Sequence, residues 1–123
     1  MRFIETKTHG FLDYLMGILL LLLPTILGLD MESPAGAVPM ILGAMTIVYS
    51  LLTSYELGIA NLISMKTHLA IDLLNGIVLA ASPWLFNFDE VIFLPHLILG
   101  VVEIMASLMT RTYPDSVPAA GQH

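Results

Sequence analysis

The chain has 123 residues, of which 57% are hydrophobic and only 11% are charged. Soluble domains carry about a quarter charged residues, so this composition argues against a water-soluble globule, and it is too apolar for a disordered chain. The net charge of -6, with four Lys and Arg residues, argues against a nucleic-acid binder. Because cysteine is absent, there is no disulfide framework and no thiolate metal site. We therefore expect one small integral membrane domain, residues 1–123, with the lipid bilayer as its partner.

Four apolar stretches follow one another along the chain, at about residues 8–29, 37–55, 67–86 and 92–110. Each is long enough for a helix to cross a hydrocarbon core of ~30 Å. The short connections between them hold turn-forming and charged residues, as loops do. We predict an all-α polytopic membrane protein whose four transmembrane helices form a four-helix bundle. The tail, residues 114–123, is predicted to be loose.

The four basic residues indicate how the helices cross the membrane. Arg2 and Lys7 precede the first stretch, Lys66 lies in the middle connection, and Arg111 follows the last stretch. All four therefore lie on one side, and the two connections on the other side hold acidic residues without Lys or Arg. The positive-inside rule predicts a multi-pass protein of the cytoplasmic (inner) membrane with both termini in the cytoplasm.

The sequence contains an internal duplication. A Lys-Thr-His triplet, followed by Asp and Gly at four-residue intervals, begins at Lys7 and recurs 59 positions later at Lys66. An Ile-Leu-Gly triplet begins at Ile41 and recurs 57 positions later at Ile98. We predict two tandem helical hairpins, at about residues 7–55 and 66–111, related by a pseudo-two-fold axis along the membrane normal.

The third stretch ends in Ser82-Pro83-Trp84. In the context of a duplicated hairpin, this tripeptide resembles the signature of the SPW-repeat membrane proteins, small prokaryotic proteins built from paired transmembrane helices. The likeness covers about residues 7–111. The first half departs from the pattern because Leu23-Pro24-Thr25 stands at the equivalent place, so that only the proline is shared. The resemblance implies the paired-helix fold and no established biochemical activity.

Small and polar residues form one stripe on each predicted helix. At 100° per residue, His9, Asp13 and Gly17 share one face of the first helix, and their copies share one face of the third. The other two helices carry stripes at 3-4-3 spacing: Gly43, Thr46, Ser50, Thr53 and Gly100, Glu103, Ser107, Thr110. Such stripes are typical of helix contacts within membranes. We expect them to face inward and to gather five candidate site residues in the cytoplasmic half of the bundle: His9, Asp13, His68, Asp72 and Glu103.

Several functions fit these five side chains. Our preferred interpretation is a non-enzymatic structural or accessory module, in which His and Asp bond to each other within one helix or across the pseudo-two-fold axis. Such a module needs no cofactor, and a homo-oligomer or a larger membrane complex would suit it. The alternatives are an ion or proton site on the three acids, a divalent metal site of imidazole and carboxylate ligands, and a haem held by His9 and His68.

The remaining motifs do not indicate an enzyme. The sequence contains no phosphate-binding glycine loop and no H-E-x-x-H motif, and no Ser-His-Asp arrangement lies at a sensible depth, so no catalytic residue is predicted. The carbonyls freed by Pro24 and Pro83 are expected to be bonded by neighbouring side chains. Pro39 is expected near a helix start, where its missing N–H is harmless. The other predictions concern exposed positions: a surface location for His96, and places at the membrane boundary for Tyr55, Trp84 and Phe88.

Overall fold

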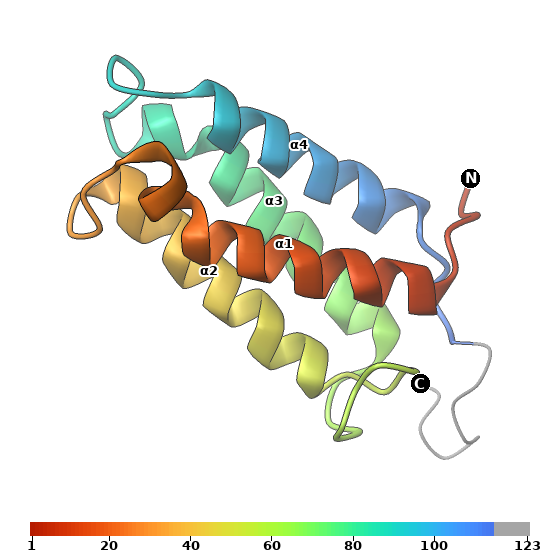
Figure 1. The fold of residues 1–123 in the computed structure, drawn as a ribbon. Helices are drawn as coiled ribbons and strands as arrows, with labels where there is room; N and C mark the ends of the chain where they lie inside the picture. The colour runs from red at the N-terminus through yellow and green to blue at the C-terminus, as the bar shows by residue number, and fades with distance from the viewer. Residues whose placement is uncertain (115–123) are drawn as a thin grey trace.

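The structure, a computed structural model, describes residues 1–114, so the predicted loose tail lies outside the described residues except for Pro114. The described part forms four α-helices: α1 (Thr6–Leu27), α2 (Pro34–Leu51), α3 (Met65–Leu85) and α4 (Leu94–Met109). Consecutive helices run antiparallel and form a bundle (Figure 1). The predicted all-α fold of four helices is confirmed.

Three of these helices, α1, α2 and α3, are long and apolar enough to cross a membrane. The fourth, α4, is equally apolar but has only 16 residues, which corresponds to about 24 Å of helix. It begins later than predicted, with Pro95 in its first turn. Proline is favoured at this place because the first turn of a helix needs no backbone N–H donor.

Each pair of consecutive helices packs closely because glycines lie in the contact. Between α1 and α2, a Cβ atom added at Gly43 would lie 2.7 Å from the carbonyl oxygen of Gly17. Between α3 and α4, a Cβ atom added at Gly100 would lie 2.4 Å from the backbone nitrogen of Ala80. Small residues permit such close backbone approach between membrane helices. The glycine-containing faces therefore point inward, as the stripes predicted.

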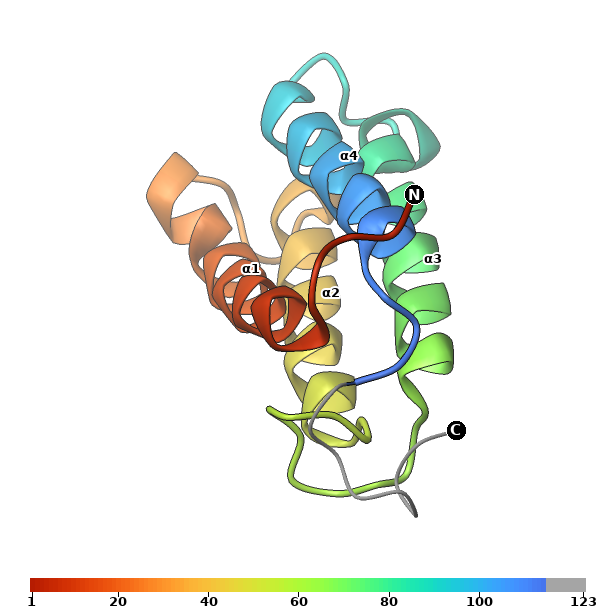
Figure 2. The same ribbon diagram turned by 90° about the vertical axis from the view of Figure 1, so that its right-hand side faces the viewer.

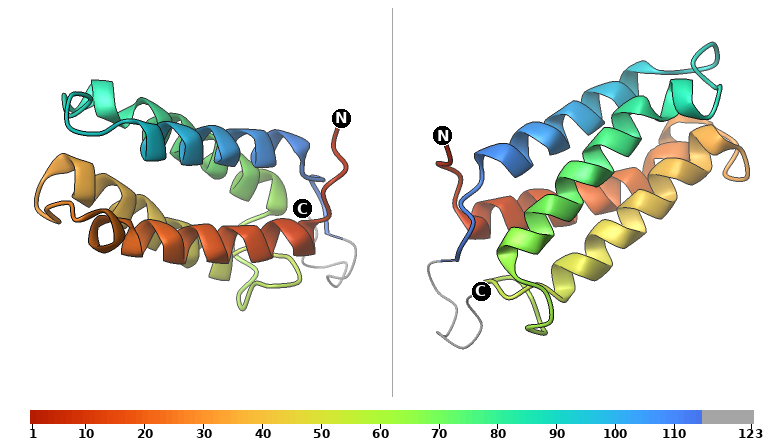
Figure 3. Two further views of the ribbon diagram at one scale, coloured as in Figure 1. Left: turned by 45° about the horizontal axis from the view of Figure 1, so that its top comes forward. Right: turned by 180° about the vertical axis from the view of Figure 1, so that it is seen from behind.

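The two helix pairs meet mainly along α2 and α3. The backbones of α1 and α4 stay apart over most of their length (Figures 2 and 3). An apolar core of Leu20, Leu23, Leu42 and Leu79 lies between the pairs. Leu20 and Leu79 occupy equivalent positions in the two repeats, and both are completely buried. The bundle is thus more tightly joined on one side than on the other.

The duplication extends beyond the helices at the basal end of the bundle, where α1 and α3 begin and α2 and α4 end. A β-bridge joins Ile4, before α1, to Thr110, after α4. An equivalent bridge joins Ile63, before α3, to Thr53, after α2. Each bridge ties the beginning of one repeat to the end of the other.

Pro83 and Pro39 each leave one backbone carbonyl without its helical N–H donor, and a nearby side chain donates a hydrogen bond to that carbonyl instead. Pro83 lacks the N–H that would reach the carbonyl of Leu79, and the hydroxyl of Ser82 donates to that oxygen at 2.7 Å. Ser82 thereby confirms the expected replacement in the second repeat. The expectation for Pro39 was wrong, because α2 begins at Pro34 and Pro39 therefore lies inside the helix.

The displaced start of α2 explains why the predicted surface location of His96 was also wrong. Pro39 leaves the carbonyl of Ala35 without its helical donor, and Nε2 of His96 donates to that oxygen at 2.8 Å. His96 is completely buried. Phe88 packs against it, with ring centroids 5.0 Å apart, and is only 5% exposed, so Phe88 is not the exposed interfacial anchor that the sequence predicted. Trp84, by contrast, is 48% exposed.

Candidate metal centre

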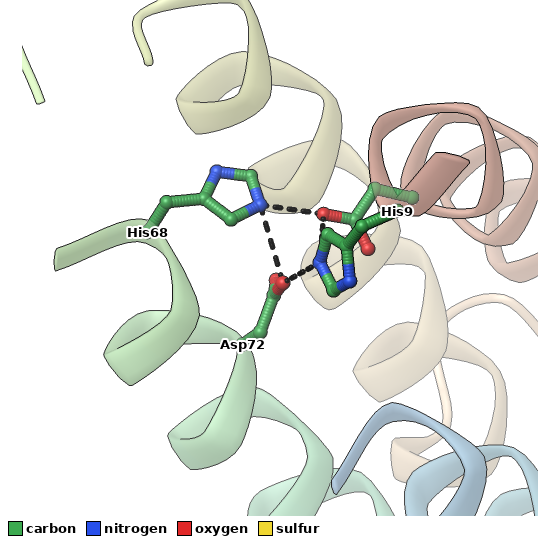
Figure 4. A group of neighbouring side chains, drawn as sticks. His9, His68 and Asp72 are labelled. Atoms are coloured by element: carbon green, nitrogen blue, oxygen red, sulfur yellow. Dashed lines mark hydrogen bonds and ion pairs between the residues drawn. The ribbon is translucent and has the colours of Figure 1, made fainter. Parts of the chain in front are cut away.

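Four of the five predicted site residues come together at the basal end of the bundle. His9 and Asp13 belong to the first turns of α1, and His68 and Asp72 belong to the equivalent turns of α3. All four side chains are buried, with residue exposures between 0% and 6%. Figure 4 shows His9, His68 and Asp72 pointing toward one another from the two helices. The duplicated pattern thus forms one centre, with half of it from each repeat.

Each histidine makes its shorter carboxylate contact with the aspartate of the other repeat. Nε2 of His9 lies 2.6 Å from Oδ2 of Asp72, and Nε2 of His68 lies 2.5 Å from Oδ2 of Asp13. The contacts within one repeat are longer, at 3.0 Å for His9 and Asp13 and 3.2 Å for His68 and Asp72. Nitrogen and oxygen atoms therefore alternate around a ring, and all four atoms lie within 4.8 Å of one another.

A threonine holds the second ring nitrogen of each histidine. Nδ1 of His9 lies 2.8 Å from the hydroxyl of Thr110, and Nδ1 of His68 lies 2.8 Å from the hydroxyl of Thr53. Each hydroxyl donates its single proton to the carbonyl four residues earlier, at 2.6 Å. The hydroxyl must therefore accept from the imidazole, which assigns a proton to Nδ1 of both histidines. Their Nε2 atoms are left to face the carboxylates.

This arrangement requires two further protons or a cation inside the ring. Two carboxylates with two neutral imidazoles would place a charge of about -2 in a buried site, with the Nε2 lone pairs facing carboxylate oxygens. Two further protons on the imidazoles would neutralise the site, and so would one divalent cation. The four side chains are thus able either to close on themselves through charged hydrogen bonds or to coordinate an ion.

The two aspartates differ in their other neighbours. The phenol of Tyr49 donates a hydrogen bond to Oδ1 of Asp72, and the amide nitrogen of Asn75 lies 3.4 Å from the same phenol oxygen. In the second repeat, Ala106 stands at the position equivalent to Tyr49. Sequence reasoning missed Tyr49 and Asn75 because neither has a copy. The available signal was the position of Tyr49, three residues after Thr46 on the polar side of α2.

Tyr55 also lies against the centre. The sequence predicted it at the membrane boundary and gave no sign of this contact. It is 4% exposed, and its ring centroid is 5.6 Å from that of His68. The loop after α2 folds back toward α1 instead of leaving the bundle, since a Cβ atom added at Gly10 of α1 would meet Tyr55 at 2.7 Å. Burial raises the pKa of the Tyr55 phenol, which keeps this side chain neutral.

Glu103 does not join the other four predicted site residues. Its residue exposure is 6%, yet its carboxylate lies outside the ring of converging atoms. Among residues 1–114, its Oε2 atom has no hydrogen-bond partner. Glu103 belongs to α4 and lines one cavity together with Asp13 of α1.

Comparison with known proteins places these features in a family. The model of the SPW repeat domain matches residues 7–110, which include both helix pairs and all the residues of the centre. No curated protein and no solved structure matches the chain. With its apolar helices and this match, the chain is a membrane protein that belongs to the SPW repeat domain family.

Proposed function

We propose that this membrane protein binds one divalent transition-metal ion between its two repeats. The ligands are Nε2 of His9 and His68 and Oδ2 of Asp13 and Asp72. The proposal rests on one observation above all: both Nδ1 atoms are held by threonine hydroxyls that must accept, so both Nε2 atoms converge with two carboxylate oxygens. Histidines that ligate metals commonly donate their other N–H to a fixed acceptor in this way. Imidazole together with carboxylate suits zinc or iron.

The spacing of the four atoms supports binding of an ion. Ligand atoms about 2.0–2.1 Å from a metal lie about 2.9 Å apart in a square plane and about 3.3 Å apart in a tetrahedron. The four N···O separations in the centre run from 2.5 to 3.2 Å. They match the planar coordination that is typical of Cu²⁺ and Ni²⁺ closely, and the tetrahedral coordination that zinc prefers requires the ring to widen by several tenths of an ångström.

The same distances argue against a haem. The iron of a bis-histidine haem lies between two imidazoles in the plane of the porphyrin. The carboxylates of Asp13 and Asp72 lie 2.5–3.2 Å from both Nε2 atoms, where the porphyrin would have to pass. A single ion fits this space and a macrocycle does not.

A structural function without an ion is the second candidate, and the contact lengths favour it too. With both imidazoles charged, the shorter contacts become charged hydrogen bonds of 2.5–2.6 Å. Because they join opposite repeats, they would lock the two helix pairs together. The chain would then be a non-enzymatic accessory module.

Metal analysis of the purified full chain separates the two candidates. We expect about one transition-metal ion per chain, either as purified or after exposure to Zn²⁺ or Fe²⁺, and no bound ion in His68→Ala. Ser50→Ala is the matched control, because Ser50 is a buried hydroxyl of α2 whose Oγ atom makes no hydrogen bond within the described residues. A wild-type chain that takes up no ion under either condition would contradict the metal proposal and favour the structural one.

We further infer that all four helices cross the cytoplasmic membrane, with the basal end in the cytoplasm. Three basic residues support this orientation: Arg2 and Lys66 line one pocket at this end, and Arg111 follows α4. Since the native chain has no cysteine, single cysteines introduced at Glu32 and Lys66 provide the test. A membrane-impermeant thiol reagent added to intact cells should label Glu32→Cys and spare Lys66→Cys. The reverse pattern would contradict the orientation, and labelling of both would contradict the four crossings.

A further inference from the structure

A cavity of about 200 Å³ lies between α1 and α4, on the side where these helices stay apart. Apolar side chains form most of its wall, and Leu12, Leu15 and Val102 among them are 46–63% exposed on the lipid-facing surface. Two acidic residues, Asp13 and Glu103, also line the cavity. An otherwise apolar cavity beside the bilayer thus contains two strong hydrogen-bond acceptors.

Glu103 provides an unpaired acceptor in this wall. The residue is more than nine-tenths buried, and its Oε2 atom has no hydrogen-bond partner within the described chain. A buried polar atom is normally bonded, because leaving it unpaired costs about 1–3 kcal/mol. A ligand that carries a hydrogen-bond donor would supply the missing partner once the Glu103 side chain turns toward the cavity.

The duplication shows which group stands beside the equivalent aspartate, Asp72, between α2 and α3. Between α2 and α3, the phenol of Tyr49 stands beside the equivalent aspartate and donates to Asp72, and its ring lines a hollow of about 410 Å³ on that face. The hydroxyl of Thr46 lies 3.5 Å from the same phenol oxygen. Between α1 and α4, Ala106 replaces Tyr49 and Glu103 replaces Thr46, so a methyl group and a carboxylate stand where a phenol and a hydroxyl stand in the first repeat.

We propose that the α1–α4 cavity binds a lipid-soluble phenol or hydroquinone, whose hydroxyl donates to Asp13 or Glu103 as Tyr49 donates to Asp72. The size is suitable, because an apolar cavity of about 150 Å³ is known to hold a benzene ring. The chemistry favours a hydroxyl, because the side chains of Asp13 and Glu103 offer oxygen atoms that accept its hydrogen bond, whereas an ether of the same size has no proton to donate. The exposed apolar rim lets such a ring enter from the bilayer.

Binding of 4-butylphenol tests this proposal, with its methyl ether, 4-butylanisole, as the matched probe without a donor. The full chain in lipid nanodiscs is titrated with each compound, and bound ligand is measured by saturation-transfer NMR against empty nanodiscs. We expect saturable binding of the phenol, at least tenfold tighter than that of the ether. The titration is done with and without added Zn²⁺, so that failure of the metal proposal and failure of this one remain distinguishable.

Two variants locate the binding. Ala106→Tyr should abolish saturable phenol binding, because the new side chain places its own ring in the cavity beside Asp13. Val48→Tyr, which adds the same ring to an exposed lipid-facing position of α2, should leave binding unchanged. Should Ala106→Tyr fail to fold by circular dichroism, Glu103→Leu is the second variant, and it should weaken binding at least fivefold.

Three results would overturn the proposal. The first is equal affinity for the phenol and its ether, or no saturable binding of either. The second is unchanged phenol binding in a folded Ala106→Tyr variant or in Glu103→Leu. The third is a dimer in which a second copy covers the α1–α4 face, seen as crosslinking between cysteines introduced at Leu15, because the ligand would then have no access.

Discussion

Asp72 and Asp13 occupy equivalent positions in the two repeats, but their surroundings differ. On the α2–α3 side, Tyr49 donates to Asp72, and Asn75 lies close to the same phenol. On the α1–α4 side, Asp13 lines a cavity of about 200 Å³ together with Glu103. The histidines on the two sides are nevertheless held alike, each with Nδ1 at 2.8 Å from a threonine hydroxyl.

The comparison separates two kinds of residue. The duplicated residues, a histidine, an aspartate and a threonine from each repeat, form the ring and fix its orientation. The unduplicated residues, Tyr49 and Glu103 above all, determine that a phenol donates to Asp72 on one side, whereas a second acidic residue stands near Asp13 on the other. Equivalent substitutions in the duplicated set should therefore have equal effects on ion binding, whereas substitutions in the unduplicated set should affect one side only.

The largest effect is expected from removing a histidine. His9→Ala and His68→Ala should each weaken metal binding at least a hundredfold, because each removes one of four ligands and leaves a buried carboxylate with less positive charge beside it. The measurement is isothermal titration of the metal-free chain with Zn²⁺. Clearly unequal losses in the two variants would contradict a centre shared evenly by the repeats.

Removing a threonine hydroxyl should have the next largest effect. Thr53→Val and Thr110→Val keep the side-chain shape but remove the acceptor for Nδ1, and we expect each to weaken metal affinity about 10–100-fold. The same titration measures the loss, with Ser50→Ala as the control that should bind as the wild type does. Wild-type affinity in both valine variants would show that the histidines do not need this orientation.

The two helix contacts, α1 with α2 and α3 with α4, should lose similar amounts of stability when the glycine in each contact is replaced. Gly43→Ala and Gly100→Ala both place a Cβ atom too close to neighbouring backbone atoms, so each should destabilise the fold by about 1–3 kcal/mol. Unfolding in increasing mole fractions of sodium dodecyl sulfate measures this change. Val101→Ala, at an exposed position next to Gly100, is the control, and an equal loss there would contradict the role of close packing.

The smallest effect on metal binding is expected from Tyr49, on the α2–α3 side. Tyr49→Phe removes only the hydroxyl that donates to Asp72, which should weaken metal binding about three- to tenfold, corresponding to about 1 kcal/mol. Tyr14→Phe is the control, because the hydroxyl of Tyr14 donates to the carbonyl of Leu57 and not to an aspartate. If both variants bound metal equally well, Tyr49 would have no part in orienting Asp72.

Much of this structure follows from sequence patterns with a clear physical basis. The four helices follow from the lengths of the apolar stretches, and their inward faces follow from the spacing of small and polar residues. The meeting of His9 with His68 follows from the duplication, since equivalent residues on equivalent helices lie at one depth. The pairing of His9 with Asp72 could not be predicted, because a spacing of four residues equally allows a contact with Asp13.

The differences between the α1–α4 side and the α2–α3 side could not be predicted from the sequence for another reason. Helical periodicity assigns Glu103 to an inward face but does not show that its carboxylate lies outside the ring. Tyr49 has no copy, so the duplication did not single it out. The burial of His96 depends on the carbonyl that Pro39 leaves free in another helix, a contact between distant parts of the chain that no local pattern encodes.

X-ray absorption spectroscopy at the metal edge tests the central claim most directly, because it reports the atoms around the ion in the intact chain. For the wild-type protein loaded with Zn²⁺, we predict a first shell of nitrogen and oxygen atoms at about 2.0–2.1 Å, with the outer-shell scattering of two imidazole rings. The double variant His9→Ala/His68→Ala should lose that imidazole signal. A spectrum without imidazole scattering in the wild type, or the same spectrum in both proteins, would contradict the proposed centre.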